Sequence, residues 1–418
     1  MQLSAFGEKF SARSGVVDLM RDLGEALHEN PDMLFMGGGN PAQLPAVASV
    51  YRSRLQALLD APSQWQRLAG SYQSPQGDRG FRLALANDLR KRYGWDLGAD
   101  NIAVTNGSQS AYFLLYNLFA GRMPDGGHRR IHLPLSPEYI GYADAGIAHD
   151  LFSATPPIIE LTADNEFTYR LDRAKLHLDE QVGAVCVSRP TNPSGNVLDA
   201  EELEYLESLV AERDIPLIVD GAYGAPFPDI TFVEAQPRWN ESTILTLSLS
   251  KLGLPGLRTG IIVASEEVIE AFNSANTIMS LASGSMGPAL AENLISSGTL
   301  QNLTEQHIKP FYRERMAHAV ACAHKAFAGL PYRLHQAQGA FFLWCWFDNL
   351  PISSATLYTQ LKASGVLAIP GEPFFIGLDP DWPHARQCLR LSYAQDSAVV
   401  DKGLARVGTV VRRAFEAG

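Results

Sequence analysis

The feature that most constrains the fold is the alternation of short, uninterrupted apolar runs with longer helical patterns through the middle of the chain. Strands that are apolar on both faces are typical of a parallel sheet covered on both sides. The apolar runs lie at residues 102–105, 131–135, 184–188, 216–220, 244–249 and 261–264. Between them, residues 109–120 and 200–214 have the helical period, and Asp199 is placed to cap the second helix. This order predicts an α/β fold with a mostly parallel sheet between two layers of helices.

The two ends of the chain differ from its middle. The 418 residues are enough for two or three domains. From about residue 287 the pattern is helical, and strands are expected again at 339–347, 366–369 and 389–393 before a C-terminal helix from about residue 397. We therefore predict an N-terminal arm at 1–45, a large domain at 46–286, a connecting helix at 287–330 and a small α/β domain at 331–418.

Composition and apolar patterning exclude several classes of protein. The formal net charge of -11 argues against a nucleic-acid-binding protein, which usually has a basic surface. The longest strongly apolar run, at 340–347, is far shorter than the ~20 residues of a membrane helix. The four cysteines form no CxxC pair, so no metal site is expected and a reducing compartment is favoured. We expect a soluble cytoplasmic protein without nucleic-acid or membrane partners.

The segment SLSKLGLPGLRTG carries the strongest chemical signal. Lys251 ends an apolar strand and is followed by glycines, which leave room for a ligand. A desolvated lysine has a lowered pKa, and its neutral amine can form a Schiff base. The guanidinium of Arg258 offers paired N–H donors that suit a phosphate group, and Ser248 adds a hydroxyl donor. The alternative is a strand-end lysine capped by a glycine loop.

Two further segments follow predicted strands. Asp220 ends the strand PLIVD and precedes Tyr223, and in open α/β sheets ligands bind beyond such strand ends. A carboxylate there can hold a pyridine nitrogen protonated, although a helix N-cap is the simpler interpretation. Asn192, in RPTNPSGN, can donate to the same ligand, or the segment can be a Pro/Gly turn of no chemical interest.

Two more residues are candidates for binding an anion. Ser108 lies at a strand-to-helix junction, where backbone N–H groups attract phosphate, unless it is only an N-cap. Arg390 lies inside the apolar strand pattern of CLRLSY. A buried arginine needs an anionic partner, which can be a substrate carboxylate or an internal acid.

The segments NGSQ, PEY, RPTNPSGN, VDGAY, SLSKLGLPGLRTG and LRLSY, in this order from about Gly37 to Tyr393, resemble the class I/II aminotransferases. These enzymes depend on pyridoxal 5'-phosphate (PLP) and have fold type I. The resemblance implies a large domain with a mostly parallel seven-stranded sheet sandwiched by helices, and a smaller α/β domain. Gly221 and Ser194 depart from residues that are frequent in the family, but no required functional group is lost.

The same resemblance implies roles for single residues. Lys251 holds the cofactor covalently and later carries the proton. Asp220 pairs with the pyridine nitrogen, and Tyr223 and Asn192 bind the phenolic oxygen. Tyr139 stacks on the ring. Gly107, Ser108, Gln109, Ser248 and Arg258 hold the phosphate. Tyr72 reaches the phosphate of a neighbouring subunit, which implies a homodimer with shared active sites. Gly39, Asn192 and Arg390 hold the substrate α-carboxylate.

Other stretches, among them FGEKFSARSG, GGGNPAQLP and WPHARQCLRLSY, resemble the members of this family that exchange amino groups between valine and pyruvate. The implied substrates are an amino acid and a 2-oxo acid, in the reaction L-valine + pyruvate = 2-oxoisovalerate + L-alanine. The apolar residues 341–347 and those near Tyr139 fit the walls of an aliphatic pocket, or they are ordinary core.

Three alternatives compete with this interpretation. A PLP enzyme of different specificity, or one that performs β-elimination on cysteine conjugates or synthesises a cyclopropane carboxylate, would share the cofactor residues. Ser248 and Lys251 formally match the S-x-x-K motif of β-lactamase-like hydrolases, but the chain has no SDN element. A PLP-binding regulator usually carries a basic DNA-binding module, and we expect no such N-terminal domain in this sequence.

Overall fold

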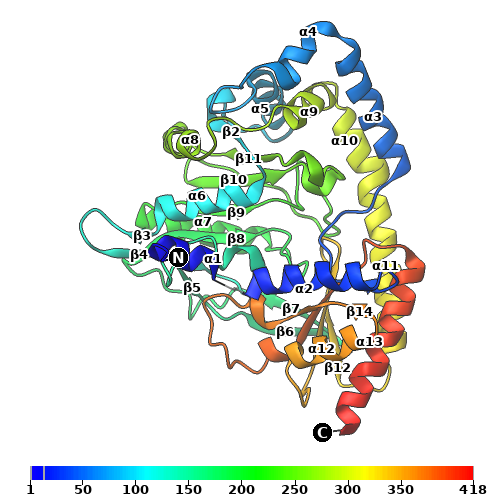
Figure 1. Ribbon diagram of the computed structural model, residues 1–418. Helices are drawn as coiled ribbons and strands as arrows, with labels where there is room; N and C mark the ends of the chain where they lie inside the picture. The colour runs from blue at the N-terminus through cyan, green and yellow to red at the C-terminus, as the bar shows by residue number, and fades with distance from the viewer. Residues whose placement is uncertain (1, 13–14, 418) are drawn as a thin grey trace.

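The larger sheet is mostly parallel, as predicted, and its central strands are buried. The computed structural model describes residues 2–12 and 15–417 (Figure 1). Its large sheet has the order β2 (Ile102–Thr105), β11 (Gly260–Val263), β10 (Thr243–Ser248), β9 (Leu217–Asp220), β8 (Val182–Ser188), β4 (His128–Leu133) and β3 (Gly121–Arg122), with β5 (Phe152–Ala154) beside β4. Within the described residues β11 and β3 alone run against the other six strands. The seven longer strands match the expected sheet, and the two-residue β3 adds an eighth.

Helices cover both faces of this sheet. Alternate residues of each strand belong to different cores: Ala184 and Cys186 of β8 pack with α6 (Ser108–Phe119) and α8 (Glu266–Ser280). Val185 and Val187 of the same strand pack on the opposite face, in the core that also holds side chains of α5 (Arg79–Tyr93), α7 (Ala200–Arg213) and α9 (Met286–Ser296). Every residue of β2, β8, β9, β10 and β11 is buried, as the uninterrupted apolar runs predicted.

A second sheet joins the C-terminal strands to a hairpin from the middle of the chain. Its order is β15 (Ile369–Pro370), β16 (Cys388–Ser392), β13 (Phe342–Phe347), β12 (Tyr332–His335), β7 (Glu166–Arg170) and β6 (Ile158–Ala163). The β6–β7 hairpin was not predicted, and β7 pairs with β12 in parallel. The proposed domain boundaries stay a prediction, because this hairpin lies inside the range assigned to the large domain.

The N-terminal segment forms a separate two-stranded sheet with a strand from the C-terminal part of the chain. Strand β1 (Leu34–Phe35) pairs with β14 (Val366–Leu367), and α2 (Gly15–Glu29) precedes it. The predicted strand at 366–369 is therefore two short strands, β14 and β15. The remaining longer helices are α3 (Pro45–Asp60), α11 (Lys309–Ala326), α12 (Ser354–Ala363) and α13 (Ser397–Ala417). Short helical turns include α1 (Ala5–Ser11), α4 (Pro62–Trp65), η1 (Gln66–Gly70), α10 (Thr299–Leu303), η6 (Thr304–Ile308) and η7 (Glu372–Phe374).

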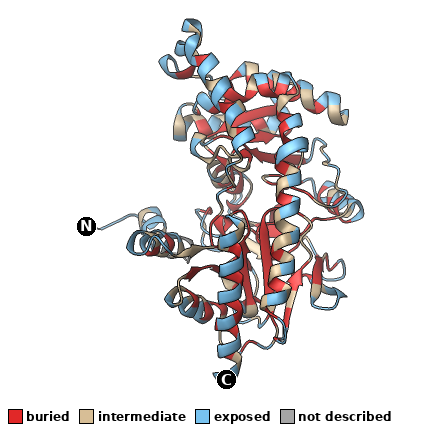
Figure 2. Cartoon of the chain, turned by 90° about the vertical axis from the view of Figure 1, so that its right-hand side faces the viewer, coloured by how far each residue is buried: buried red, intermediate tan, exposed pale blue. Residues whose placement is uncertain are grey.

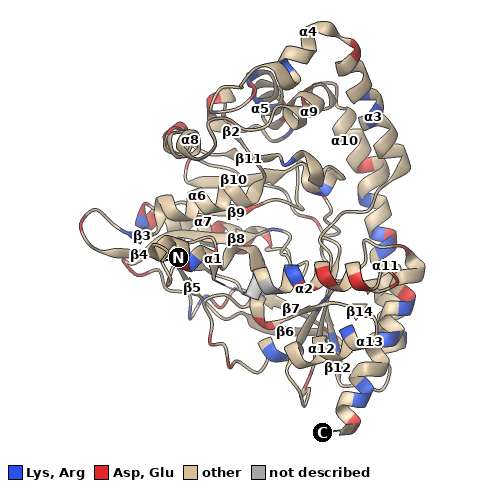
Figure 3. Cartoon of the chain, viewed as in Figure 1, with Lys and Arg blue, Asp and Glu red and all other residues tan. Residues whose placement is uncertain are grey.

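The predicted connecting helix is a series of helices. After α9 the chain turns at Gly298, which has φ +73°, a left-handed conformation that glycine adopts at little cost. α10 and η6 then lead into α11, which lies beside α13 (Figures 1 and 2). In Figure 2 the strands and the inner faces of these helices are red and their outer faces pale blue. In the view of Figure 3, basic and acidic residues are interspersed on the outer helices. None of the helices within 2–12 and 15–417 combines the length and apolarity needed to cross a bilayer.

Candidate active site

The candidate site lies at one edge of the large sheet. Ser188, Asp220 and Ser248 are the last residues of β8, β9 and β10, three neighbouring parallel strands, so all three lie at this edge of the sheet. They line a cavity of about 660 Å³, its open mouth included, which is within the range of small-ligand sites. The cavity brings together nine of the predicted residues: Ser108, Gln109, Tyr139, Asn192, Asp220, Tyr223, Ser248, Lys251 and Arg258.

Lys251 follows β10 and reaches across to the N-terminal arm. Its Nζ donates to the carbonyl oxygen of Gly39 at 2.8 Å and lies 5.3 Å from the ring centre of Tyr223. Burial, and then the positive charge of Arg390, lower the pKa of Lys251 to about 8, although Asp220 acts in the opposite direction. A substantial fraction of this amine is therefore neutral near physiological pH, as a nucleophile or proton carrier requires.

Asp220 is buried and held by two donors. The Tyr142 hydroxyl donates to its Oδ2 at 2.6 Å, and the backbone N–H of Ala222 donates to its Oδ1 at 2.9 Å. Burial raises the pKa of Asp220, and these hydrogen bonds counteract the rise. The chain continues from Asp220 into bends and turns and not into a helix, so the N-cap interpretation is wrong.

The phenol of Tyr223 lacks a partner. Its hydroxyl oxygen is buried with no hydrogen bond among the described residues, and its ring packs edge-on against Phe341 at 5.2 Å. Burial raises the pKa of Tyr223 well above its usual value, so the hydroxyl stays protonated and can donate. Since a buried hydroxyl without a partner costs free energy, a ligand oxygen at this point would remove that cost.

Arg390 is a buried cation whose observed partners are neutral. It donates to Asn192 Oδ1 at 2.6 Å and to the carbonyl oxygen of Gly37 at 2.8 Å. Its Nε has no partner, and its guanidinium lies 4.3 Å from the Phe342 ring centre and 5.2 Å from that of Phe374. Burial lowers the pKa of Arg390 to about 10, which leaves it charged at neutral pH. No carboxylate of the described chain forms an ion pair with it, so an incoming carboxylate is the natural counter-ion.

The start of α6 forms an anion-binding corner. Gly107 precedes α6 with φ +90°, and a Cβ there would lie 2.1 Å from Nη2 of Arg258. The arginine therefore lies directly on the backbone that leads into the helix. Ser108 is the first residue of the helix and not its N-cap. Free N–H groups and the helix dipole favour an anion at this end, and Arg258 adds a positive charge.

Two predicted phosphate ligands have other partners in the structure. The amide of Gln109 donates to the carbonyl oxygen of Gly141 at 2.7 Å. The Ser248 hydroxyl oxygen accepts from the backbone N–H of Ser250 at 3.1 Å, which leaves its proton available. Both side chains line the cavity.

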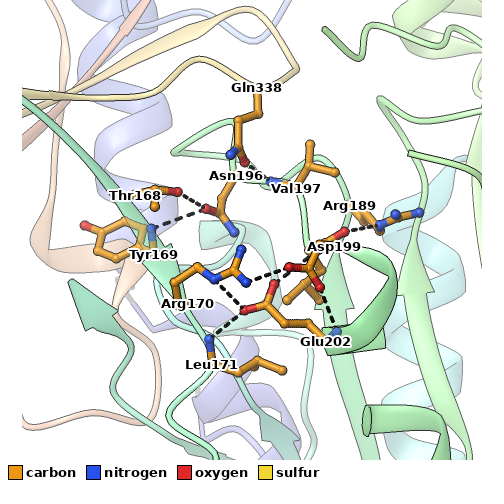
Figure 4. Close-up of polar contacts among 11 residues, drawn as sticks. Thr168, Tyr169, Arg170, Leu171, Arg189, Asn196, Val197, Asp199, Glu202 and Gln338 are labelled. Carbon is orange, nitrogen blue, oxygen red and sulfur yellow. Dashed lines mark hydrogen bonds and ion pairs between the residues drawn. The ribbon is translucent and has the colours of Figure 1, made fainter. Parts of the chain in front are cut away.

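Asn192 lies in the loop between β8 and α7, which contacts to the β6–β7 hairpin hold in place. Figure 4 shows the contacts that this loop makes through Asn196, Val197 and Asp199. The side chain of Asn196 accepts from the Thr168 hydroxyl at 3.1 Å, and Val197 N–H donates to Gln338 at 2.7 Å. Arg170 of β7 forms an ion pair with Asp199 at 2.6 Å. Asp199 caps α7 as predicted, by accepting from the backbone N–H of Glu202. These contacts fix the loop between β8 and α7.

The sequence did not predict the residues that hold the predicted site residues in position. Tyr142, which donates to Asp220, belongs to an aromatic cluster with Tyr112 and Tyr116, and such aromatic residues are ordinarily core. Glu138 is the middle residue of the PEY segment, and the sequence predicted no role for it. Both of its carboxylate oxygens contact Ser188, whose backbone N–H donates to one of them at 2.8 Å. Burial raises the pKa of Glu138 to about 8. A buried carboxyl next to an aromatic residue leaves no periodic signal in the sequence.

Tyr72 is not part of the cavity within one chain. Its side chain is 85% exposed, on the segment between η1 and α5. None of the apolar residues 341–347 lines the cavity, and Phe341 is fully buried in the core. Phe341 approaches Lys251, with 5.7 Å between the amine and the ring centre, and most of β13 is buried core.

Comparisons with known proteins agree with this geometry. A family model for aminotransferase class I and II matches residues 50–407. The chain is 46% identical to valine–pyruvate aminotransferase of Escherichia coli K12, over 99% of each chain. It superimposes with a TM-score of 0.97 on a putative amino-acid aminotransferase from Psychrobacter arcticum, which is 42% identical with full coverage of both chains. The TM-score is 0.89 against valine–pyruvate aminotransferase from Salmonella typhimurium, which is 44% identical over 97% of this chain and 100% of that one. The chain therefore belongs to the class I and II aminotransferase family.

Proposed function

We propose that this aminotransferase uses PLP to transfer the amino group of L-valine to pyruvate, which yields 2-oxoisovalerate and L-alanine. The observation that carries the proposal is the placement of Lys251. Its amine, with a pKa lowered to about 8, lines one cavity with the Asp220 carboxylate and the start of α6. The full-length identity to valine–pyruvate aminotransferases supports the choice of substrates.

The residues around the cavity fit PLP. Asp220 would pair with the ring nitrogen, and the unpartnered hydroxyl of Tyr223, with Asn192, would bind the phenolic oxygen. Tyr139 would face the ring. Gly107, Ser108, Gln109, Ser248 and Arg258 would hold the phosphate at the start of α6. When bound, PLP supplies an aldehyde for the amine of Lys251 and a ring that withdraws electrons from the substrate Cα.

The chain's own groups account for binding and proton transfer. Arg390 would bind the substrate carboxylate, because its hydrogen-bond partners are the neutral oxygens of Asn192 and Gly37 and its Nε is unpartnered. The carbonyl oxygen of Gly39 holds the amine of Lys251 at the cavity. In its neutral form that amine can take a proton from the substrate Cα and deliver it elsewhere, which is general acid–base catalysis.

The cavity favours a small apolar substrate side chain. Of the described residues that line it, Lys251 and Arg258 are the cations, and the proposal assigns both to the cofactor. An acidic side chain would therefore lack a cation of its own. The ring of Tyr139, which lines the cavity, offers apolar contact instead.

A homodimer with shared sites is part of this proposal. Large apolar side chains are exposed at five positions within residues 62–72 and 278–286: Trp65, Tyr72, Ile278, Leu281 and Met286. Gly284, in the same region, donates to Asn106 at 3.0 Å, two residues before Ser108. Large apolar side chains exposed to this degree support a subunit contact on these segments. The four cysteines are free thiols, which supports a reducing compartment such as the cytoplasm.

A steady-state survey of amino donors tests the choice of substrate. With pyruvate as acceptor, valine should give the highest kcat/KM, and aspartate and aromatic donors much lower values. A strong preference for aspartate would contradict the proposal. Release of pyruvate from a cysteine conjugate, without any acceptor acid, would favour β-elimination instead.

A further inference from the structure

Three potential metal ligands meet outside the active-site cavity, where α11 packs against α13. His318 and Cys322 are four residues apart on α11 and so share one face of that helix. Asp401 faces them from α13. The distance from His318 Nε2 to Asp401 Oδ1 is 2.6 Å, and Cys322 Sγ lies 3.2 Å from the same oxygen and 3.6 Å from the same nitrogen. One nitrogen, one oxygen and one sulfur therefore converge on a single point.

This convergence does not suit nucleophilic catalysis. In a Cys–His–Asp triad the thiol contacts one ring nitrogen and the acid contacts the other. Here Cys322 and Asp401 both contact the same ring nitrogen of His318, Nε2. Partial burial and the adjacent Asp401 carboxylate also raise the pKa of the Cys322 thiol, which opposes its activation.

One of these three distances already suits a tetrahedral divalent cation, and the other two are shorter than it requires. Bonds of about 2.3 Å to sulfur and about 2.0–2.1 Å to nitrogen and oxygen place ligand atoms roughly 3.3–3.6 Å apart. The observed sulfur–nitrogen distance of 3.6 Å already fits. The nitrogen–oxygen pair would have to open from 2.6 Å and the sulfur–oxygen pair from 3.2 Å. A turn of the Asp401 side chain, which is 48% exposed, would lengthen both distances. The open side leaves a fourth position for water.

We propose that His318, Cys322 and Asp401 form a binding site for Zn²⁺ that joins α11 to α13. Imidazole, thiolate and carboxylate are the ligand types that Zn²⁺ accepts, and a cation would relieve the repulsion between a thiolate and Asp401. The nearby Lys325 limits the affinity, because its charge opposes a cation. The sequence does not reveal the site, since Asp401 is 79 residues from Cys322.

A cation that binds only the folded chain also stabilises it. None of the three residues lines the active-site cavity, so the site is expected to act on stability and not on transamination. Zinc should therefore raise the melting temperature without changing kcat for valine.

The test uses the PLP-loaded enzyme after chelation and removal of bound metal. Equilibrium dialysis should give one Zn²⁺ per chain, and Co²⁺ should produce a thiolate-to-metal absorption band. Cys322→Ser and His318→Ala should each weaken binding about tenfold or more. His307→Ala, which replaces an exposed histidine outside the cluster, is the matched control and should bind as the wild type does.

Asp401→Asn provides a second variant if His318→Ala folds poorly, which the melting temperature and PLP absorption reveal. The proposal is overturned if the unsubstituted enzyme binds no Zn²⁺. It is also overturned if Cys322→Ser and Asp401→Asn bind Zn²⁺ as tightly as His307→Ala does.

Discussion

Glu138 is a buried carboxyl that has no ion-pair partner among the described residues. It holds the N–H of Ser188 at the end of β8, and its own N–H donates to the carbonyl oxygen of Phe374 at 2.9 Å. The next residue is Tyr139, so Glu138 ties the loop that carries this ring to the strand end that leads to Asn192. Its role is therefore one of positioning.

Two substitutions at Glu138 distinguish the effect of its hydrogen bonds from the effect of its titrating carboxyl group. Gln can accept from the Ser188 N–H and donate to its hydroxyl, so Glu138→Gln should cost less than about 1 kcal/mol and keep most activity. Glu138→Ala leaves that N–H buried and unpaired, which costs about 1–3 kcal/mol, and should also weaken PLP binding. Thermal unfolding and a PLP titration measure both effects. If Glu138→Ala bound PLP as tightly as the wild type, the positioning role would be wrong.

The raised pKa of Glu138 predicts that the stability of the fold depends on pH. Burial raises the pKa of Glu138 from 4.5 to about 8, so between these values the folded chain keeps a proton that the unfolded chain releases. Its contribution to stability is full below pH 4.5 and is lost as the pH rises to about 8. The melting temperature of Glu138→Gln should therefore rise relative to that of the wild type over this interval. Parallel melting profiles would show that Glu138 is already ionised.

The junction between β2 and α6 is the element on which phosphate binding depends. Gly107 has φ +90°, and a Cβ there would lie 2.1 Å from Nη2 of Arg258. Gly107→Ala should displace the arginine and weaken PLP binding about tenfold or more, in addition to a strain of about 1–2 kcal/mol. PLP titration with a fluorescence readout measures the affinity.

Gly94 is the matched control for this substitution. It has φ +71° at the end of α5, but a Cβ there meets no atom within 4 Å. Gly94→Ala should therefore show the strain without the loss of PLP affinity. Equal loss of affinity in both variants would mean that backbone strain, and not the contact with Arg258, is responsible.

The elements that could be predicted are those whose residues are buried on both faces. The uninterrupted apolar runs located β2, β8, β9, β10 and β11 to within a residue or two. The hairpin strand β6 was missed because most of its residues are exposed, so it shows no apolar run. Its partner β7 joins β12 across more than 160 residues, and no local pattern specifies such a pairing.

The arrangement of the whole molecule explains why so much of the candidate site followed from the sequence. Parallel strands bring their carboxyl ends to one edge, so residues predicted there, such as Asp220 and Lys251, meet in the structure. The supporting contacts could not be predicted, because they join segments distant in sequence. Gly39 to Lys251 and Gly37 to Arg390 both depend on how the N-terminal arm crosses the site.

A shared active site predicts complementation between two impaired subunits. Tyr72 is 85% exposed and outside the cavity of its own chain, so Tyr72→Ala should weaken PLP binding only if the residue acts on a neighbour. In a hybrid of Tyr72→Ala and Lys251→Ala subunits, one site would combine an intact Lys251 with an intact Tyr72. Co-expression with two affinity tags should therefore restore PLP affinity at half of the sites. A hybrid no better than the Tyr72→Ala homodimer would contradict shared sites.

The central claim is that the amine of Lys251 holds the cofactor, and covalent trapping tests it most directly. The enzyme loaded with PLP is treated with borohydride, digested and mapped by mass spectrometry. We predict one pyridoxyl label per chain, on the peptide that contains Lys251, and none in Lys251→Ala. A label on another lysine, or no label on a protein that transaminates valine, would contradict the account.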